Sequence, residues 1–174
     1  VALFSALLQH DRDWGPLLAP VLIASAFAIY YPRGMIPPTP QKITAWADIF
    51  FFTEVTAHAF FFCGALLAVK SIVVKKETRS FHGYIVWGFI LYSVAQITGA
   101  IWCQLGWGCT FRWSSRHMMS AAIWLYYAAY IHLRLLPEWD GKKKALFAAA
   151  GAIIVFAVSF SSYLHEMAFP RIGG

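Results

Sequence analysis

The sequence predicts an all-α integral membrane bundle of about five transmembrane helices. Of its 174 residues, 60% are hydrophobic and only 13% are charged, whereas soluble domains carry about 25% charged residues. The mean hydropathy is +0.59. Five apolar runs each have the length, about 20 residues, that a helix needs to cross a bilayer; they cover 15–31, 56–74, 83–104, 118–135 and 145–163. Residues 1–174 therefore form a single transmembrane domain.

The segment between the first two runs is the longest predicted loop. It holds four of the eight prolines, which cannot continue a helix, and it leads into the aromatic stretch 46–52, which we expect at the membrane interface. The three cysteines form neither a CxxC pair nor a zinc spacing, so they are interpreted as packing residues. The chain begins with Val and shows no cleavable signal peptide, so residue 1 need not be the first codon.

The charges of the loops predict the orientation. If 1–14, 70–82 and 134–144 lie on the cytoplasmic side, that side carries nine cations: Arg12, Lys70, Lys75, Lys76, Arg79, Arg134, Lys142, Lys143 and Lys144. The other side carries five: Arg33, Lys42, Arg112, Arg116 and Arg171. Because cytoplasmic loops are enriched in Lys and Arg, the N-terminus is predicted to be cytoplasmic and the C-terminus external. These loops also explain the net charge of +6 without a nucleic acid, through contact with lipid headgroups.

This topology assigns a depth to each histidine. His58 opens the second predicted span and His165 follows the fifth, so both are expected at the outer surface. His132 lies fifteen residues into the fourth helix from His117, about 22 Å deeper at ~1.5 Å per residue, near the cytoplasmic face. Two further histidines flank spans at that face: His10 and His82.

The outer level carries the kinds of side chain that bind haem. Imidazoles from two helices can clamp one iron, while aromatic rings stack on the macrocycle and cations meet its propionates. The candidate ligands are His58 and His165, and the other candidates cluster in one short segment: Trp102, Trp107, Phe111, Arg112, Trp113 and Arg116. Taken alone, these residues also fit an interfacial aromatic belt, headgroup-binding arginines and packed histidines.

The order and spacing of residues 99–134 resemble the tryptophan-rich "WWD" region of the haem-handling proteins of cytochrome c assembly, the CcsA/ResC and CcmC proteins. The matching positions are Gly99, Ala100, Ile101, Trp102, Trp107, Gly108, Trp113, Trp124, Tyr130, His132 and Arg134. His58 in TAHAFFFCGALLA and His165 in YLHEMAF occupy the places of the family's two external histidines. The resemblance covers about 56–169.

The resemblance implies one external haem b with His58 and His165 as axial ligands, above a platform of three tryptophans: Trp102, Trp107 and Trp113. It also implies a second, deeper haem at His132, for which the boundary histidines lie at a compatible depth, although ordinary helix caps explain them too. The implied partners are other membrane subunits and a c-type cytochrome or apocytochrome on the outer side. The implied location is a bacterial cytoplasmic membrane or a thylakoid-type membrane.

One departure from the family pattern bears on function. The motif has an acidic residue after its last tryptophan, where this chain has Ser114. If that carboxylate helps to present haem to an apocytochrome, its loss would impair transfer and leave binding intact. His117, in the same segment, is a further candidate ligand that also fits an interfacial cap.

Two carboxylates near His58 in the sequence are also candidates for a functional role. Glu54 lies four residues before His58, so both share a face if the helix extends back that far. A carboxylate bonded to the far imidazole nitrogen would raise the basicity of the ligand. Alternatively, Glu54 or Asp48 could accept a proton from a quinol, or simply be an interfacial acid exposed to water.

Two functions compete. The first is a haem-handling protein, a component of a cytochrome c haem lyase, in which the chain binds and orients haem and no side chain is catalytic. The second is a CcsA-like subunit of a respiratory or photosynthetic electron-transfer complex that carries electrons between quinone and a c-type cytochrome, or serves as an anchor. The tryptophan segment and the two histidines favour the first, and the short length and the lost acid favour the second. A channel has little support, because no polar path beyond His132 is visible.

Overall fold

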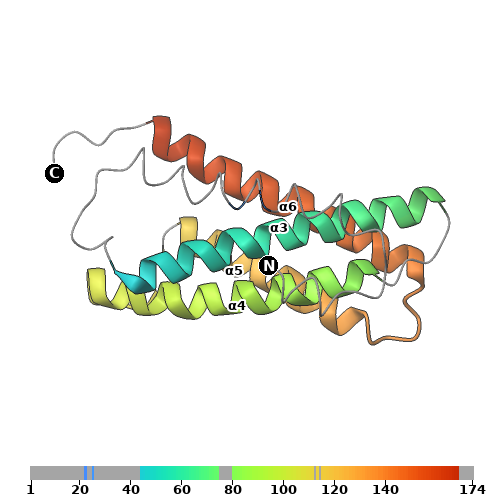
Figure 1. Cartoon of the computed structure of the whole chain (residues 1–174), viewed down its shortest axis with the longest axis horizontal. Helices are drawn as coiled ribbons and strands as arrows, with labels where there is room; N and C mark the ends of the chain where they lie inside the picture. The colour runs from blue at the N-terminus through green and yellow to red at the C-terminus, as the bar shows by residue number, and fades with distance from the viewer. Residues whose placement is uncertain are drawn as a thin grey trace.

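In the computed structural model, the described residues form four long helices, each of which runs antiparallel to the one before it (Figure 1). The structure describes residues 44–74, 80–111, 113 and 115–168, with Leu22 and Ser25; the side chains at 80, 107, 115, 116 and 158–168 lie outside this description. The helices are α3 (Ala45–Val74), α4 (Ser80–Trp107), α5 (Ser115–Leu133) and α6 (Gly141–Ala168). The described part of the chain contains no strand, which confirms the all-α prediction.

Four of the five predicted spans coincide with these helices, although the span 118–135 extends two residues beyond the end of α5. The run 15–31 lies outside the described residues except for Leu22 and Ser25. The largest difference is that α3 begins at Ala45 rather than at residue 56. Thr44 caps this helix, because its Oγ1 accepts a hydrogen bond from the Ala47 amide at 3.2 Å. The negative charge of Asp48 in the first turn also favours a helix start here. The aromatic stretch expected as an interfacial loop is therefore helical.

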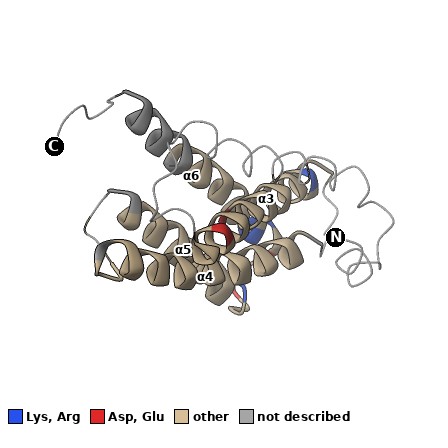
Figure 2. Ribbon diagram, turned by 60° about the vertical axis from the view of Figure 1, so that its left-hand side comes forward, with Lys and Arg blue, Asp and Glu red and all other residues tan. Residues whose placement is uncertain are grey.

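Two helices of the described part are long and apolar enough to cross a membrane: α3 over Ala45–Val74 and α4 over Phe81–Gly106. α4 contains no Lys, Arg, Asp or Glu, and α3 contains only three such residues, Asp48, Glu54 and Lys70, so most of the described ribbon is tan in Figure 2. Large apolar side chains stay exposed along both, including Leu66 at 48% and Ile97 at 62%, as expected for surfaces in contact with lipid. The count of five spans and the orientation of the termini remain predictions.

Glycines let α3 and α4 pack closely and fix their register. A Cβ added to Gly88 would lie 2.8 Å from the Phe61 ring, and one added to Gly99 would lie 2.8 Å from the Phe50 ring. The α4 backbone thus approaches α3 where a larger residue would collide. Residue 88 of α4 contacts residue 61 of α3, and residue 99 contacts residue 50. The two helices are therefore antiparallel with a constant register between these contacts.

Stacked aromatic rings attach the other two helices to this pair. The rings of Phe61 and Tyr127 are stacked with centroids 3.5 Å apart, which holds α5 against α3. The Tyr126 hydroxyl donates to the Phe147 carbonyl at 2.6 Å and the two rings stack, which holds α6 against α5. α6 also packs along α3.

The bundle has two ends of different chemistry. The tryptophan end consists of the start of α3, the end of α4, residues 108–111, Trp113 and the start of α5. Here Gly108, with φ 72°, stops α4 and its amide donates to the Gln104 carbonyl at 2.9 Å. The lysine end consists of the end of α3, the start of α4, the end of α5 and the start of α6. Here Asp140 caps the N-terminus of α6, because its Oδ1 accepts a hydrogen bond from the Lys143 amide at 2.7 Å.

Candidate functional site

His58 lies near the middle of α3, beside α4. Its ring centroid is 5.4 Å from that of Tyr92, with 34° between the ring planes. Because α3 begins at Ala45, His58 is about 20 Å from the start of the helix at ~1.5 Å per residue. The expectation that His58 opens its span is therefore wrong; the Thr44 cap adds about three turns before it.

The Nε2 atom of His58 is buried and has no hydrogen-bond partner among the described residues. A buried polar atom left unsatisfied costs about 1–3 kcal/mol, so native proteins seldom retain one unless a ligand or water completes it. A neutral imidazole nitrogen is a common ligand of haem iron. The donor chemistry and the unsatisfied atom of His58 therefore fit an iron ligand.

The other histidines with described side chains each have a partner. His82 Nδ1 is hydrogen-bonded to the Tyr130 hydroxyl, and His117 Nε2 lies 3.7 Å from the Cys103 sulfur. His132 donates from Nδ1 to the Ala128 carbonyl at 2.7 Å. Within this described set, His58 is the exception.

The register of the two helices brings two polar residues of α3 and two of α4 to neighbouring levels of their interface. Because α3 extends back to Ala45, Glu54 and His58 share one face, as expected for residues four apart in a helix. Tyr92 and Gln96 share a face of α4 by the same spacing. We call these four residues the polar cluster. The Tyr92 hydroxyl donates to the Ser120 carbonyl at 3.3 Å, which links the cluster to α5.

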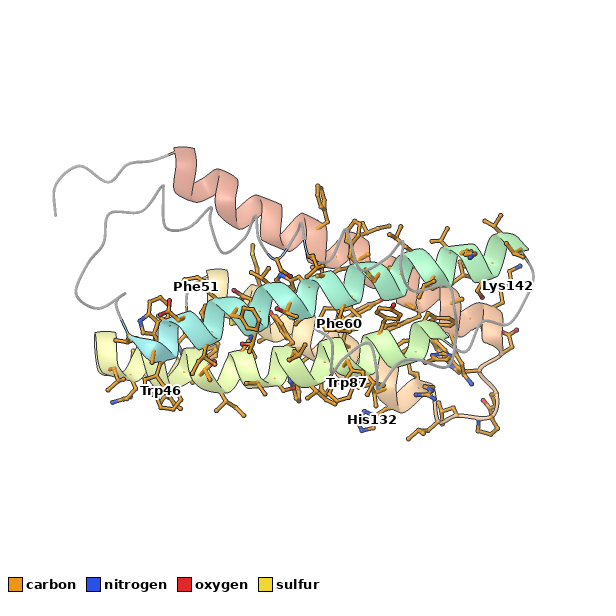
Figure 3. All side chains as sticks on the ribbon, viewed as in Figure 1. Trp46, Phe51, Phe60, Trp87, His132 and Lys142 are labelled. Atoms are coloured by element: carbon orange, nitrogen blue, oxygen red, sulfur yellow. The ribbon has the colours of Figure 1, made fainter. Side chains whose placement is uncertain are left out.

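Trp102 is packed between α4 and the start of α3. Its ring stacks on Phe50 with centroids 5.8 Å apart and meets the edge of Phe51 at 5.6 Å. Phe51 and the neighbouring Trp46 are labelled at the start of α3 in Figure 3. This contact closes the α3–α4 interface one to two turns beyond the polar cluster, toward the tryptophan end.

The segment after α4 carries an exposed aromatic group. Phe111 meets Trp113 edge-on at 5.4 Å and His117 at the same centroid distance. Trp113 is 85% exposed. The segment thus presents an aromatic surface beside the start of α5, at the same end of the bundle as Trp102.

Several predicted site residues are placed only in part. Arg112 and Ser114 lie outside the described residues. Three others lie within helices, with side chains outside the description: Trp107 in α4, Arg116 in α5 and His165 in α6. The structure therefore places His58, Trp102, Phe111, Trp113 and His132 of the predicted set.

His132 and His82 are not brought together. His132 lies at the end of α5, is exposed, and projects away from the bundle (Figure 3). His82 contacts Tyr130, two residues before His132 and therefore ~200° around the helix from it. His82 is thus on another side of α5 from His132, and His10, the other suggested partner, lies outside the described residues.

Reasoning from sequence missed Tyr92 and Gln96. The Gln96 Nε2 atom is also buried and has no hydrogen-bond partner among the described residues. A signal for Gln96 existed, because it is an uncharged polar residue inside the apolar run 83–104, and polar residues within membrane spans are costly and often functional. Tyr92 carried no such signal, since its role depends on the register of two helices.

Two long apolar helices, a histidine with a buried and unsatisfied ring nitrogen, and an exposed aromatic surface at one end of the bundle characterise the described part of this chain. The model of the family described as cytochrome C assembly protein matches residues 14–167. The chain belongs to this family. The resemblance to the proteins of cytochrome c assembly is thereby confirmed.

Curated relatives agree with the family assignment. A cytochrome c biogenesis protein CcsA of Prochlorococcus marinus (strain MIT 9515) is 39% identical over 79 residues, which cover 45% of this chain and 25% of the relative. The protein of that name from Chlamydomonas reinhardtii is 26% identical over 172 residues, covering 87% of this chain and 49% of the relative. The chain thus spans from a quarter to about half of the length of these relatives. No solved structure matches it.

Proposed function

We propose that this chain binds haem b and presents it on the outer side of the membrane for cytochrome c assembly. The observation that carries the proposal is the buried, unpartnered Nε2 atom of His58 in a chain of this family. Bound haem would supply the iron and the vinyl groups that become attached to a c-type cytochrome. The chain itself would bind, orient and shield the cofactor.

Two neighbouring helices carry the proposed axial ligands. His58 is on α3 and His165 on α6, and these helices pack along each other. The aromatic residues would contact the macrocycle: Trp102, Trp107, Phe111 and Trp113. Arg112 and Arg116 would neutralise propionates, because guanidinium groups pair well with carboxylates. Other membrane subunits and an apocytochrome at the aromatic end are the proposed partners, in a bacterial cytoplasmic or thylakoid-type membrane.

His132 is proposed as a ligand of a second haem. Its Nδ1–H donates to the Ala128 carbonyl, which fixes the tautomer and leaves Nε2 able to bind a metal. Since the side chain faces away from the bundle, the opposite ligand would come from outside the described helices.

Absorption spectra of the full chain purified in detergent test the proposal. We expect a b-type spectrum in which the signal of the haem held by His58 and His165 is lost in His58→Ala and in the His58→Ala, His165→Ala double variant, whereas a haem at His132 remains. His132→Ala should remove only the second haem. His82→Ala is the matched control, because that histidine already has a partner.

Deletion of the gene separates assembly from electron transfer. General loss of covalently bound haem from c-type cytochromes supports the assembly role. Intact cytochromes with the loss of one respiratory or photosynthetic activity would instead support the electron-transfer subunit, including its proposed quinone contact.

A further inference from the structure

Gln96 is the second residue of the polar cluster with an unsatisfied buried nitrogen. It lies one helical turn, ~5.4 Å, beyond Tyr92 on the same face of α4. Tyr92 is beside His58, and the antiparallel register pairs Gly99 with Phe50. Gln96 is therefore about one turn from His58 in the direction of the tryptophan end.

The nearby hydroxyl groups are already engaged. Thr53 donates to the Ile49 carbonyl at 2.7 Å, and Thr98 donates to the Val94 carbonyl at 2.9 Å. The Tyr92 hydroxyl donates to Ser120. The buried side-chain nitrogen of Gln96, by contrast, has no hydrogen-bond partner among the described residues.

The two unsatisfied nitrogens require different partners. The imidazole of His58 can bind iron through a lone pair, whereas the side-chain NH₂ of Gln96 needs a hydrogen-bond acceptor. Haem b offers such acceptors only at its two propionate carboxylates, which lie at one edge of the ring. One haem could therefore satisfy both atoms, and its ring is wide enough to bridge one helical turn.

We propose that Gln96 is a haem-binding residue whose amide donates a hydrogen bond to a propionate of the haem held by His58. This inference rests on the proposed function. This hydrogen bond would direct one propionate toward α4, on the tryptophan side of His58. It would also give the site a preference for haem with a free carboxylate. A hydrogen bond to a charged acceptor is stronger than one to a neutral acceptor.

Titration of the purified, haem-free full chain with haem b and with haem b dimethyl ester tests the inference. The ester keeps the iron and the ring but lacks the carboxylate charges. We expect the wild-type chain to prefer haem over the ester, and Gln96→Leu to reduce that preference about tenfold by lowering the affinity for haem more than that for the ester. Gln104→Leu, at an exposed position of α4, is the matched control and should keep the preference.

A purely structural role gives a different result. If Gln96→Leu weakens haem and ester equally, or leaves the preference unchanged, the inference is wrong. A reduced preference in Gln104→Leu would contradict it as well. If the Leu variant folds poorly, Gln96→Met repeats the test, because methionine is an unbranched apolar residue of similar size. In the haem-bound Gln96→Met variant, the propionate bending band of the resonance Raman spectrum should shift. Failure of the proposed function would appear separately, as an unchanged spectrum in His58→Ala.

Discussion

His58, near the middle of α3, and His82, at the lysine end, occupy similar surroundings. Each lies near a tyrosine ring of a neighbouring helix, Tyr92 at 5.4 Å and Tyr130 at 6.0 Å. Yet His82 is hydrogen-bonded to its tyrosine, whereas the Nε2 of His58 has no described partner. The comparison teaches that residue type and aromatic contact do not distinguish a ligand from a packed histidine. The satisfaction of the ring nitrogens does.

The electrostatic surroundings sharpen the contrast. The positive charges of Arg134 and Lys144 act on His82 at the lysine end. Such charges disfavour another cation, including a ferric iron, at the same place. His58 instead lies beside Tyr92 at the α3–α4 interface, in the polar cluster. We therefore interpret His82 as a structural residue of the helix ends.

The largest predicted effect breaks the register on which the comparison depends. In Gly88→Ala, the new Cβ would meet the Phe61 ring at 2.8 Å, so α4 must shift relative to α3. We expect a loss of about 1–3 kcal/mol in the free energy of unfolding and weaker haem binding, because His58 and Tyr92 separate. Unfolding in detergent and a haem titration measure the two effects.

Gly83→Ala is the matched control for that substitution. Nothing lies within 4 Å of a Cβ at this position. The change should be neutral or stabilise the helix by up to about 1 kcal/mol, because alanine favours helix more than glycine does. Equal destabilisation by both substitutions would show that close packing at Gly88 does not set the register.

An intermediate effect is expected from Tyr130→Phe, which makes His82 resemble His58. The substitution removes the hydroxyl and leaves Nδ1 of His82 without its partner. We predict a loss of about 1–2 kcal/mol in unfolding free energy with an unchanged haem spectrum. A new or altered haem signal would show that His82 also binds haem once it loses its partner. That result would contradict the distinction between His58 and His82.

The smallest effect concerns an unsatisfied group that we assign to packing. The Tyr127 hydroxyl is buried without a described partner, and a Cβ at Gly151 would lie 2.7 Å from it. Tyr127→Phe should raise the unfolding free energy by up to about 1 kcal/mol, because it removes an unpaired polar group, and should leave haem binding unchanged.

Tyr126→Phe provides the reference for the neighbouring position. It removes the hydrogen bond to the Phe147 carbonyl and should lower the stability by about 1 kcal/mol. Destabilisation by Tyr127→Phe of the same size would mean that the Tyr127 hydroxyl has a partner after all.

Part of this structure was predictable from sequence. Hydropathy and length located the four described helices, because a membrane span requires a continuous apolar run. The start of α3 was missed, since the prolines and aromatic residues before 56 suggested a loop while the decisive feature was one local cap at Thr44. The role of His58 as a ligand stays a prediction, and its expected depth changed with that helix start.

The polar cluster could not be predicted in the same way. Tyr92 and Gln96 join His58 only through the antiparallel register of α3 and α4, which Gly88 and Gly99 set by contact with rings on α3. Likewise, the bond between His82 and Tyr130 links residues 48 positions apart. Hydropathy specifies that such helices exist, and side-chain packing specifies which residues meet.

Haem titration of His58→Ala and His82→Ala, side by side in the full chain, tests the central claim most directly. The account predicts that His58→Ala loses the b-type absorption with two histidine ligands, while His82→Ala binds haem as the wild-type chain does. An unchanged spectrum in His58→Ala, or loss of binding only in His82→Ala, would contradict it.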